Sequence, residues 1–216
     1  MRSDFEIINF LRILAMVNDL VLFEHPLFIT DMMYARENNM VGKATYADKD
    51  VHFGNVAYMH KDVAEALLSL VPVLQEKQLK MRICDAYRPP LAHQKMVEIV
   101  PIKGFFKADY RTSNHCHGTA VDVCLTDMNG HNLLYPTEID AYEERFQKQV
   151  SKGEFAEFQQ HLQKARHDFT DAAPEALANR VFLKQLMENH GFESIPHEWW
   201  HYNLKGWAEY PVIEWE

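Results

Sequence analysis

The sequence has few cysteines and no pattern that would use them in pairs. Its 216 residues include three cysteines, Cys84, Cys116 and Cys124. The number is odd and no two of them form a CxxC pair, which excludes a disulfide framework and the common cysteine-based zinc motifs. We therefore expect free thiols and a reducing compartment.

Positive charge and long apolar runs are also scarce. The net charge is −9, whereas a nucleic-acid-binding protein normally carries a basic stripe that attracts phosphate. The same charge disfavours docking on anionic lipid. No apolar run approaches the ~18–20 residues that span a bilayer. The sequence thus predicts neither a nucleic-acid partner nor membrane insertion.

The first residues do not resemble an export signal. Residues 1–17 lack a clearly cationic start and a small-residue cleavage site. The apolar positions Phe5, Ile8 and Leu11 instead predict an amphipathic helix. We expect a cytoplasmic protein, and a periplasmic one if a signal has been removed.

The length and patterning predict one domain over residues 1–216. Apolar periodicity and turn residues predict these elements: a helix over Asp62–Gln75 capped by Asp62, strands over Met81–Tyr87 and Ala120–Leu125, a helix over Pro174–Asn189, and a final strand within Phe192–Asn203. Pro72 should kink or end the first helix. Residues 143–170 are rich in charge with helical apolar spacing, which predicts a helical insertion: a surface excursion or a lid over a site.

The first cluster of chemically active residues covers Ser113 to Asp122. His115 and Asp122 are seven residues apart, and imidazole nitrogen and carboxylate oxygen are both good zinc ligands. Gly118 would allow the turn that returns His115 toward the strand. Alone, the pattern is a weak signal, because it is more typical of a histidine that is hydrogen-bonded in a core.

A second cluster runs from His197 to His201. Read as HExxH, it would be a zincin motif with both histidines on one helix. Pro196 and the lack of a convincing third ligand, with only Glu209 and Glu214 downstream, disfavour that reading. Alternatively, Glu198 and His201 alone are functional. Because residues three apart on a regular strand face opposite ways, a turn or bulge must then lie between them.

A third cluster centres on Arg88, which Pro89 and Pro90 follow directly. Prolines fix the backbone beyond the arginine, so its guanidinium can be held in one direction. A rigid cation beside a zinc site would stabilise the oxyanion that forms when water attacks a carbonyl.

Together these clusters resemble a known family. The ordered motifs SxHxxGxAxD, ExxH and YRP are similar to those of the zinc D-Ala-D-Ala dipeptidases of the VanX type, within the wider group of D,D-carboxypeptidases and murein metallopeptidases. The segments around residues 34–42 and 187–193 also resemble this family. The resemblance covers roughly residues 30 to 205.

The resemblance implies the roles of eight residues in an enzyme that holds one zinc ion per chain. They are the metal ligands His115, Asp122 and His201; the general base and acid Glu198; the transition-state cation Arg88; the ammonium-binding Asp140; and the pocket-lining Ser113 and Tyr34. The family usually has HSRG where this chain has residues 115–118, so His117 stands in place of an arginine.

The resemblance further implies an α+β fold, in which helices flank a central and mostly antiparallel sheet. The expected activity is zinc-dependent hydrolysis of a small D-amino-acid dipeptide, D-Ala-D-Ala first of all. One alternative is a D,D-carboxypeptidase or murein endopeptidase that cuts longer peptidoglycan fragments. Another is a zinc-binding module without catalysis. The oligomeric state is not predicted.

Overall fold

A five-stranded sheet forms the centre of the molecule. The computed structural model describes residues 19–100, 106–139 and 156–215. The sheet has the order β2-β4-β5-β7-β6, in which β2 and β4 are parallel and the other neighbours are antiparallel. The strands are β2 (Phe28–Thr30), β4 (Lys80–Asp85), β5 (Ala120–Thr126), β7 (Glu198–Leu204) and β6 (Phe192–Ile195). The predicted α+β class with a mostly antiparallel sheet is confirmed.

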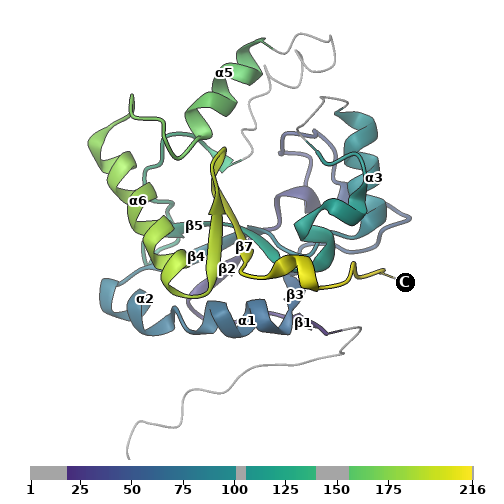
Figure 1. The fold of residues 1–216 in the computed structure, drawn as a ribbon, viewed down its shortest axis with the longest axis horizontal. Helices are drawn as coiled ribbons and strands as arrows, with labels where there is room; N and C mark the ends of the chain where they lie inside the picture. The colour runs from purple at the N-terminus through teal and green to yellow at the C-terminus, as the bar shows by residue number, and fades with distance from the viewer. Residues whose placement is uncertain (1–18, 101–105, 140–155, 216) are drawn as a thin grey trace, which may run out of the picture.

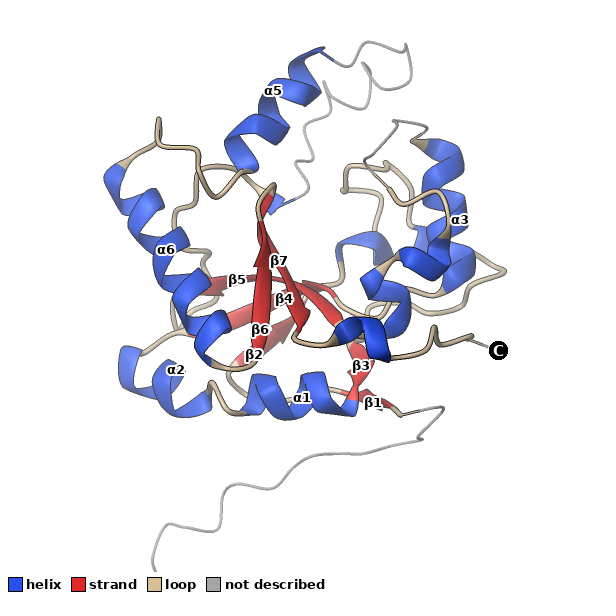
Figure 2. Ribbon diagram, viewed as in Figure 1, coloured by secondary structure: helices blue, strands red, loops and turns tan. Residues whose placement is uncertain are grey.

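Helices surround this sheet on several sides. In Figure 1, α1 and α2 lie below it, α6 on the left and α3 on the right. Figure 2 shows the same layers by type of structure. The helices are α1 (Lys61–Leu68), α2 (Val71–Lys77), α3 (Pro90–Ile99), α5 (Ala156–Ala165) and α6 (Pro174–Asn189); a small second sheet pairs β1 (Leu20–Leu22) with β3 (Tyr58–His60).

Strand β5 lies in the middle of the core. All seven of its residues are buried, because β4 and β7 flank it and helices pack around the sheet. Side chains on both faces of this strand are therefore shielded from water, and a polar one among them requires a partner. The three cysteines are buried free thiols, as expected.

The helix predicted over residues 62–75 is interrupted near Pro72, as expected, and forms α1 and α2. Pro72 lies in the first turn of α2, where its missing N–H is harmless. The cap of α1 is not Asp62, as predicted, but His60, whose Nδ1 accepts a hydrogen bond from the backbone N–H of Asp62 at 3.2 Å.

The single strand expected at the C-terminal end is a hairpin of β6 and β7 instead. The residues between the two strands form a turn, and Pro196, which has no N–H to give to a strand partner, lies within it. This hairpin brings two runs of the sequence to the edge of the sheet, and β7 pairs directly with β5.

Three predictions fall wholly or partly outside the described residues: the amphipathic helix at residues 1–17, residues 143–155 of the predicted insertion, and Asp140. Of that insertion, α5 is described. No helix in the described ranges is long and apolar enough to cross a membrane.

Candidate metal and catalytic site

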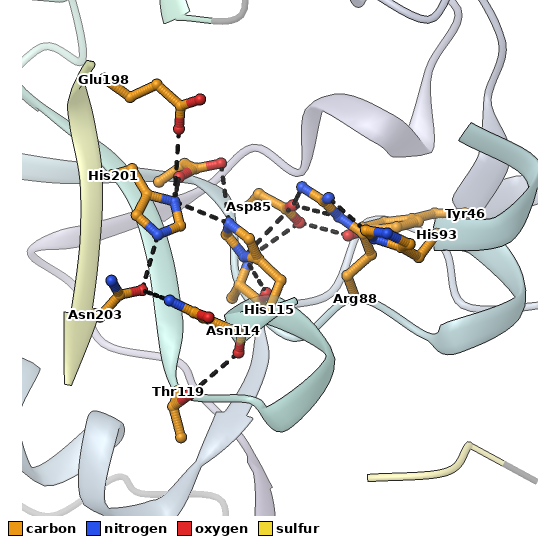
Figure 3. Close-up of polar contacts among 12 residues, drawn as sticks. Tyr46, Asp85, Arg88, His93, Asn114, His115, Thr119, Glu198, His201 and Asn203 are labelled. Carbon is orange, nitrogen blue, oxygen red and sulfur yellow. Dashed lines mark hydrogen bonds and ion pairs between the residues drawn. The ribbon is translucent and has the colours of Figure 1, made fainter. Parts of the chain in front are cut away.

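Strand register places three polar residues in one row across the sheet. Asp122 on β5 lies directly opposite His201 on β7 and opposite Asp85 on β4. Directly opposed residues in an antiparallel pair project to the same face, so the three side chains share one side of the sheet. The exposed fractions of Asp85 and Asp122 are 0% and 2%. Figure 3 labels two members of this row, His201 and Asp85.

A tight turn brings His115 over the row. His115 lies in a 3-10 helix, Asn114–His117, which ends at Gly118 with φ of +68°. A side chain is disfavoured there, both by this φ and by space, because a Cβ would lie 3.1 Å from the backbone nitrogen of His60. The glycine thus lets the chain reverse into β5, and the predicted turn is present.

His115, Asp122 and His201 converge on one point. Each offers a ligand atom, and these atoms lie within 4.8 Å of one another. His115 Nε2 is 3.2 Å from His201 Nδ1 and 3.4 Å from Asp122 Oδ2, while His201 Nδ1 is 3.0 Å from Asp122 Oδ1. In the part of the chain that the structure describes, this is the one such group of three, and His197 is not a member.

The outer hydrogen bonds of the two imidazoles show that the convergence suits a cation. His115 Nδ1 donates to the carbonyl oxygen of Ala86 at 2.8 Å. His201 Nε2 donates to Oδ1 of Asn203 at 2.8 Å. A neutral imidazole has only one N–H, so its other nitrogen carries a lone pair. Two lone pairs and a carboxylate then face each other, an arrangement that a divalent metal ion fits.

The electrostatics of the cluster point the same way. Burial would raise the pKa of the Asp122 carboxyl, but the imidazoles of His115 and His201 hold that pKa well below its usual value. Burial opposes the charged form of His115, yet the carboxylates of Asp122 and Asp85 outweigh it and raise the pKa of His115. Both shifts show that the cluster attracts positive charge.

Glu198 reaches the same site through an irregularity in the hairpin. Ser194 pairs with Tyr202, but the next residue, Ile195, pairs with Glu198, so the register shifts between them. Strand β7 is therefore irregular between Glu198 and His201. This irregularity agrees with the bulge or turn that is needed for both side chains to reach one site. Glu198 Oε2 lies 3.8 Å from His201 Nδ1, and its side chain extends toward the metal cluster in Figure 3.

Arg88 lies on the other side of His115 in a rigid setting. Its Nε and Nη2 both donate to Oδ2 of Asp85, at 3.1 and 2.6 Å. Its guanidinium lies over the rings of Tyr34 and Phe106, at 5.1 and 5.6 Å from the ring centres. Burial opposes its charge, but Asp85, Tyr46, Tyr34 and Asp122 together outweigh burial and raise the pKa of Arg88 further. The arginine is a fixed, permanent cation.

A cavity of about 520 Å³ joins these groups. The predicted site residues that line it are Tyr34, Arg88, Ser113, His115, Asp122, Glu198 and His201. The structure thus brings together seven of the eight predicted residues, while Asp140 lies outside the described ones. The cavity has the size of a small-molecule site.

Sequence reasoning missed the residues that support this site. They are Tyr46, which donates a hydrogen bond to Asp85; Asp85 itself; His93 beside Arg88; and the asparagines Asn114 and Asn203. Asp85 lies three residues before Arg88, and this spacing was the available signal. Tyr46 lies 39 residues from Asp85, and Asn114 lies 89 residues from Asn203. His93 and Asn203 are near Arg88 and His201 in the sequence, but no known pattern marks their role.

Comparison with known proteins agrees with the geometry. The family model described as D-ala-D-ala dipeptidase, peptidase M15, matches residues 26–212. A D-alanyl-D-alanine dipeptidase of Escherichia coli (strain K12) is 30% identical over 184 residues, which cover 85% of this chain and 82% of that protein. A D-alanyl-D-alanine dipeptidase of Enterococcus faecium is 25% identical over 193 residues, covering 81% and 85% respectively.

The match to the family model extends from before β2 to beyond β7, so it includes every strand of the central sheet and all the residues of the metal cluster. An enzyme family of this kind excludes the hypothesis of a zinc-binding module without catalysis. The chain belongs to the D-Ala-D-Ala dipeptidase family and is a metallopeptidase.

Proposed function

We propose that this enzyme hydrolyses D-Ala-D-Ala to two molecules of D-alanine, with one zinc ion held by His115, Asp122 and His201. The observation that carries the proposal is the convergence of three acceptors, two of which are imidazoles whose outer hydrogen bonds are already made. Three protein ligands, rather than four, are typical of a catalytic zinc site. The two relatives named as dipeptidases support the substrate.

The zinc ion supplies Lewis acidity at the scissile carbonyl and lowers the pKa of a water molecule toward neutrality. Glu198 is the proton carrier. Its carboxylate, 3.8 Å from the ligating nitrogen of His201, accepts a proton from the attacking water and delivers it to the leaving amine. The side chain is partly exposed, at 20%, which leaves it accessible from the cavity.

Arg88 stabilises the charge that develops on the carbonyl oxygen. Because Asp85 binds Nε and Nη2, the guanidinium cannot swing as the reaction proceeds. Its Nη1 is 3.5 Å from Nδ1 of His93, a long contact that leaves donor capacity toward the cavity. A preoriented donor of this kind acts mainly on the transition state.

The remaining assignments concern the ends of the dipeptide. Ser113 and Tyr34 line the cavity and are buried, with 5% and 0% exposed. We assign them to substrate contact, and Asp140 to the substrate ammonium. An amide in a longer peptide carries no charge for Asp140 to bind, so this assignment predicts a preference for very short substrates.

The direct test is a panel of dipeptides that varies the chirality at both positions, assayed with zinc present. Release of D-alanine from D-Ala-D-Ala, with little turnover of L-Ala-L-Ala, is the expected result. Efficient cleavage of pentapeptides instead would favour the D,D-carboxypeptidase or endopeptidase alternative. Equal turnover of all four stereoisomers would contradict the proposed specificity.

A further inference from the structure

Asn203 is hydrogen-bonded to His201, one of the three residues of the metal cluster. It follows His201 by two residues on β7, so both side chains project to the same face of the sheet. Its exposed fraction is 3%. Its Oδ1 accepts two hydrogen bonds, from His201 Nε2 at 2.8 Å and from Asn114 Nδ2 at 2.6 Å. Figure 3 shows Asn203 between His201 and Asn114, with a hydrogen bond to each.

We propose that Asn203 and Asn114 form a positioning pair that determines which nitrogen of His201 faces the metal. The amide oxygen of Asn203 can only accept, and the amide group of Asn114 holds that oxygen in place. His201 must therefore carry its proton on Nε2, which leaves the Nδ1 lone pair facing Asp122 and His115. This inference rests on the proposed metal site.

The pair also joins the two segments that carry the histidine ligands. Asn114 directly precedes His115, and its carbonyl oxygen accepts from the backbone N–H of Thr119 at 3.2 Å and from Thr119 Oγ1 at 3.1 Å. Asn114 is thus fixed at its backbone and at its side chain. The contact to Asn203 ties the 3-10 helix to β7, so the separation of the two imidazoles is set before any metal binds.

The outer hydrogen bonds of the two histidines differ in whether a substitution can remove the acceptor. His115 Nδ1 donates to a backbone oxygen, that of Ala86, which no substitution removes. His201 depends on a side chain. A ligand held by an outer hydrogen bond typically loses 10–100-fold in metal affinity when that bond is deleted, on the order found at other metal sites. Asn203 is therefore where the outer support can be removed selectively.

The test compares zinc affinities, measured by competition with a chromophoric chelator. Asn203→Leu keeps the shape of the side chain and deletes the acceptor, so we expect roughly 10–100-fold weaker zinc binding. Asn203→Asp keeps an acceptor oxygen and should bind zinc as tightly as the parent. The absorption spectrum of the cobalt-substituted protein should change in Asn203→Leu and be preserved in Asn203→Asp.

Asn39→Leu is the matched control. Asn39 is equally buried, with 2% exposed, and it accepts from the backbone N–H of Val41 and Gly42 and donates to the carbonyl oxygens of Arg36 and Lys43. These hydrogen bonds stabilise a loop, and none of them involves a proposed metal ligand. Asn39→Leu should lower the thermal midpoint and leave zinc affinity unchanged.

Parent-like zinc affinity in Asn203→Leu overturns the inference, and so does an equal loss in Asn203→Leu and Asn203→Asp. If Asn203→Leu does not fold, Asn114→Ala replaces it: this variant frees the Asn203 amide to rotate and should also weaken zinc binding, whereas unchanged affinity would refute the pair. A parent protein that binds no zinc would refute the proposed function itself, which keeps the two failures distinct.

Discussion

Asp85 and Asp122 are neighbours on adjacent strands, and their surroundings give them different tasks. Both are buried, face the same side of the sheet and are paired directly in register. Asp85 is surrounded by donors: Tyr46 and the backbone N–H of Ala86 donate to Oδ1, and Arg88 donates twice to Oδ2. Asp122 instead faces two imidazole nitrogens, His201 Nδ1 at 3.0 Å and His115 Nε2 at 3.4 Å, and the other nitrogen of each ring already donates to a neighbouring oxygen.

The two carboxylates differ in how many hydrogen-bond donors surround them, although the residue type is the same. A buried carboxylate that permanent donors satisfy is a structural anchor, and here it fixes the guanidinium of Arg88. A buried carboxylate that meets acceptors lacks a counter-charge until a cation arrives. The same side chain, one strand further along, is thus suited to the role of metal ligand that we propose for it.

The largest effect is expected from Asp122. Asp122→Ala removes a ligand, and the two remaining imidazoles do not complete a zinc site. We expect loss of stoichiometric zinc, measured by elemental analysis after dialysis, together with loss of dipeptide hydrolysis. Full zinc content in this variant would show that Asp122 is not a ligand.

Asp85→Ala should act on stability rather than on metal content. It leaves the Arg88 charge buried and unpaired, and breaking a buried pair in this way costs about 3–5 kcal/mol of unfolding free energy. Urea denaturation measures this loss. The double variant Asp85→Ala with Arg88→Ala should lose less than the sum of the two single variants, because it leaves no unpaired charge. Additive losses would mean that the pair is not coupled.

Arg88→Ala should lower kcat by about 10²–10³-fold, since an oxyanion donor acts in the transition state. Zinc content should be unchanged, because Arg88 contacts no proposed ligand through its side chain. Steady-state kinetics with D-Ala-D-Ala measure kcat and KM separately. An effect confined to KM would make Arg88 a substrate anchor instead.

The smallest effect concerns His93, which lies beside Arg88. Burial, reinforced by the charge of Arg88, lowers the pKa of His93 to about 4 from its usual 6.5. The unfolded chain therefore binds a proton more readily than the folded one, and stability falls as the pH drops from 6.5 toward 4. Between pH 7 and pH 5 the parent should lose about 2 kcal/mol more than His93→Gln. Urea denaturation measures both losses. If the parent and His93→Gln lost the same unfolding free energy between pH 7 and pH 5, the lowered pKa of His93 would be contradicted.

The sequence predicted the class of the fold and the proximity of the principal site residues. It did not predict the strand register or the hydrogen bonds that hold those residues in place. Strand Ala120–Thr126 carries a continuous apolar pattern around Asp122, and Gly118 signals the turn before it, so both could be identified locally. The pairing of Asp122 with Asp85 and His201 depends on strand register, which no single segment encodes. The chemical roles of these residues, and the extent of the domain, stay predictions.

The misses have physical causes. Asp62 has the side chain of a typical helix cap, but the helix starts one residue earlier, where His60 meets the Asp62 N–H. The hairpin of β6 and β7 was read as one strand because its turn is short. The contact of Tyr46 with Asp85 joins residues 39 positions apart, and such a contact follows from tertiary packing alone.

The measurement that tests the account most directly is a comparison of the parent with Glu198→Gln, which preserves shape and removes the proton acceptor. Each protein is assayed for zinc content and for D-alanine release from D-Ala-D-Ala. We predict about one zinc per chain in both, with turnover lowered about 10²–10⁴-fold in the variant. Parent-like turnover in a variant that holds its zinc would contradict the role of Glu198 and the mechanism built on it.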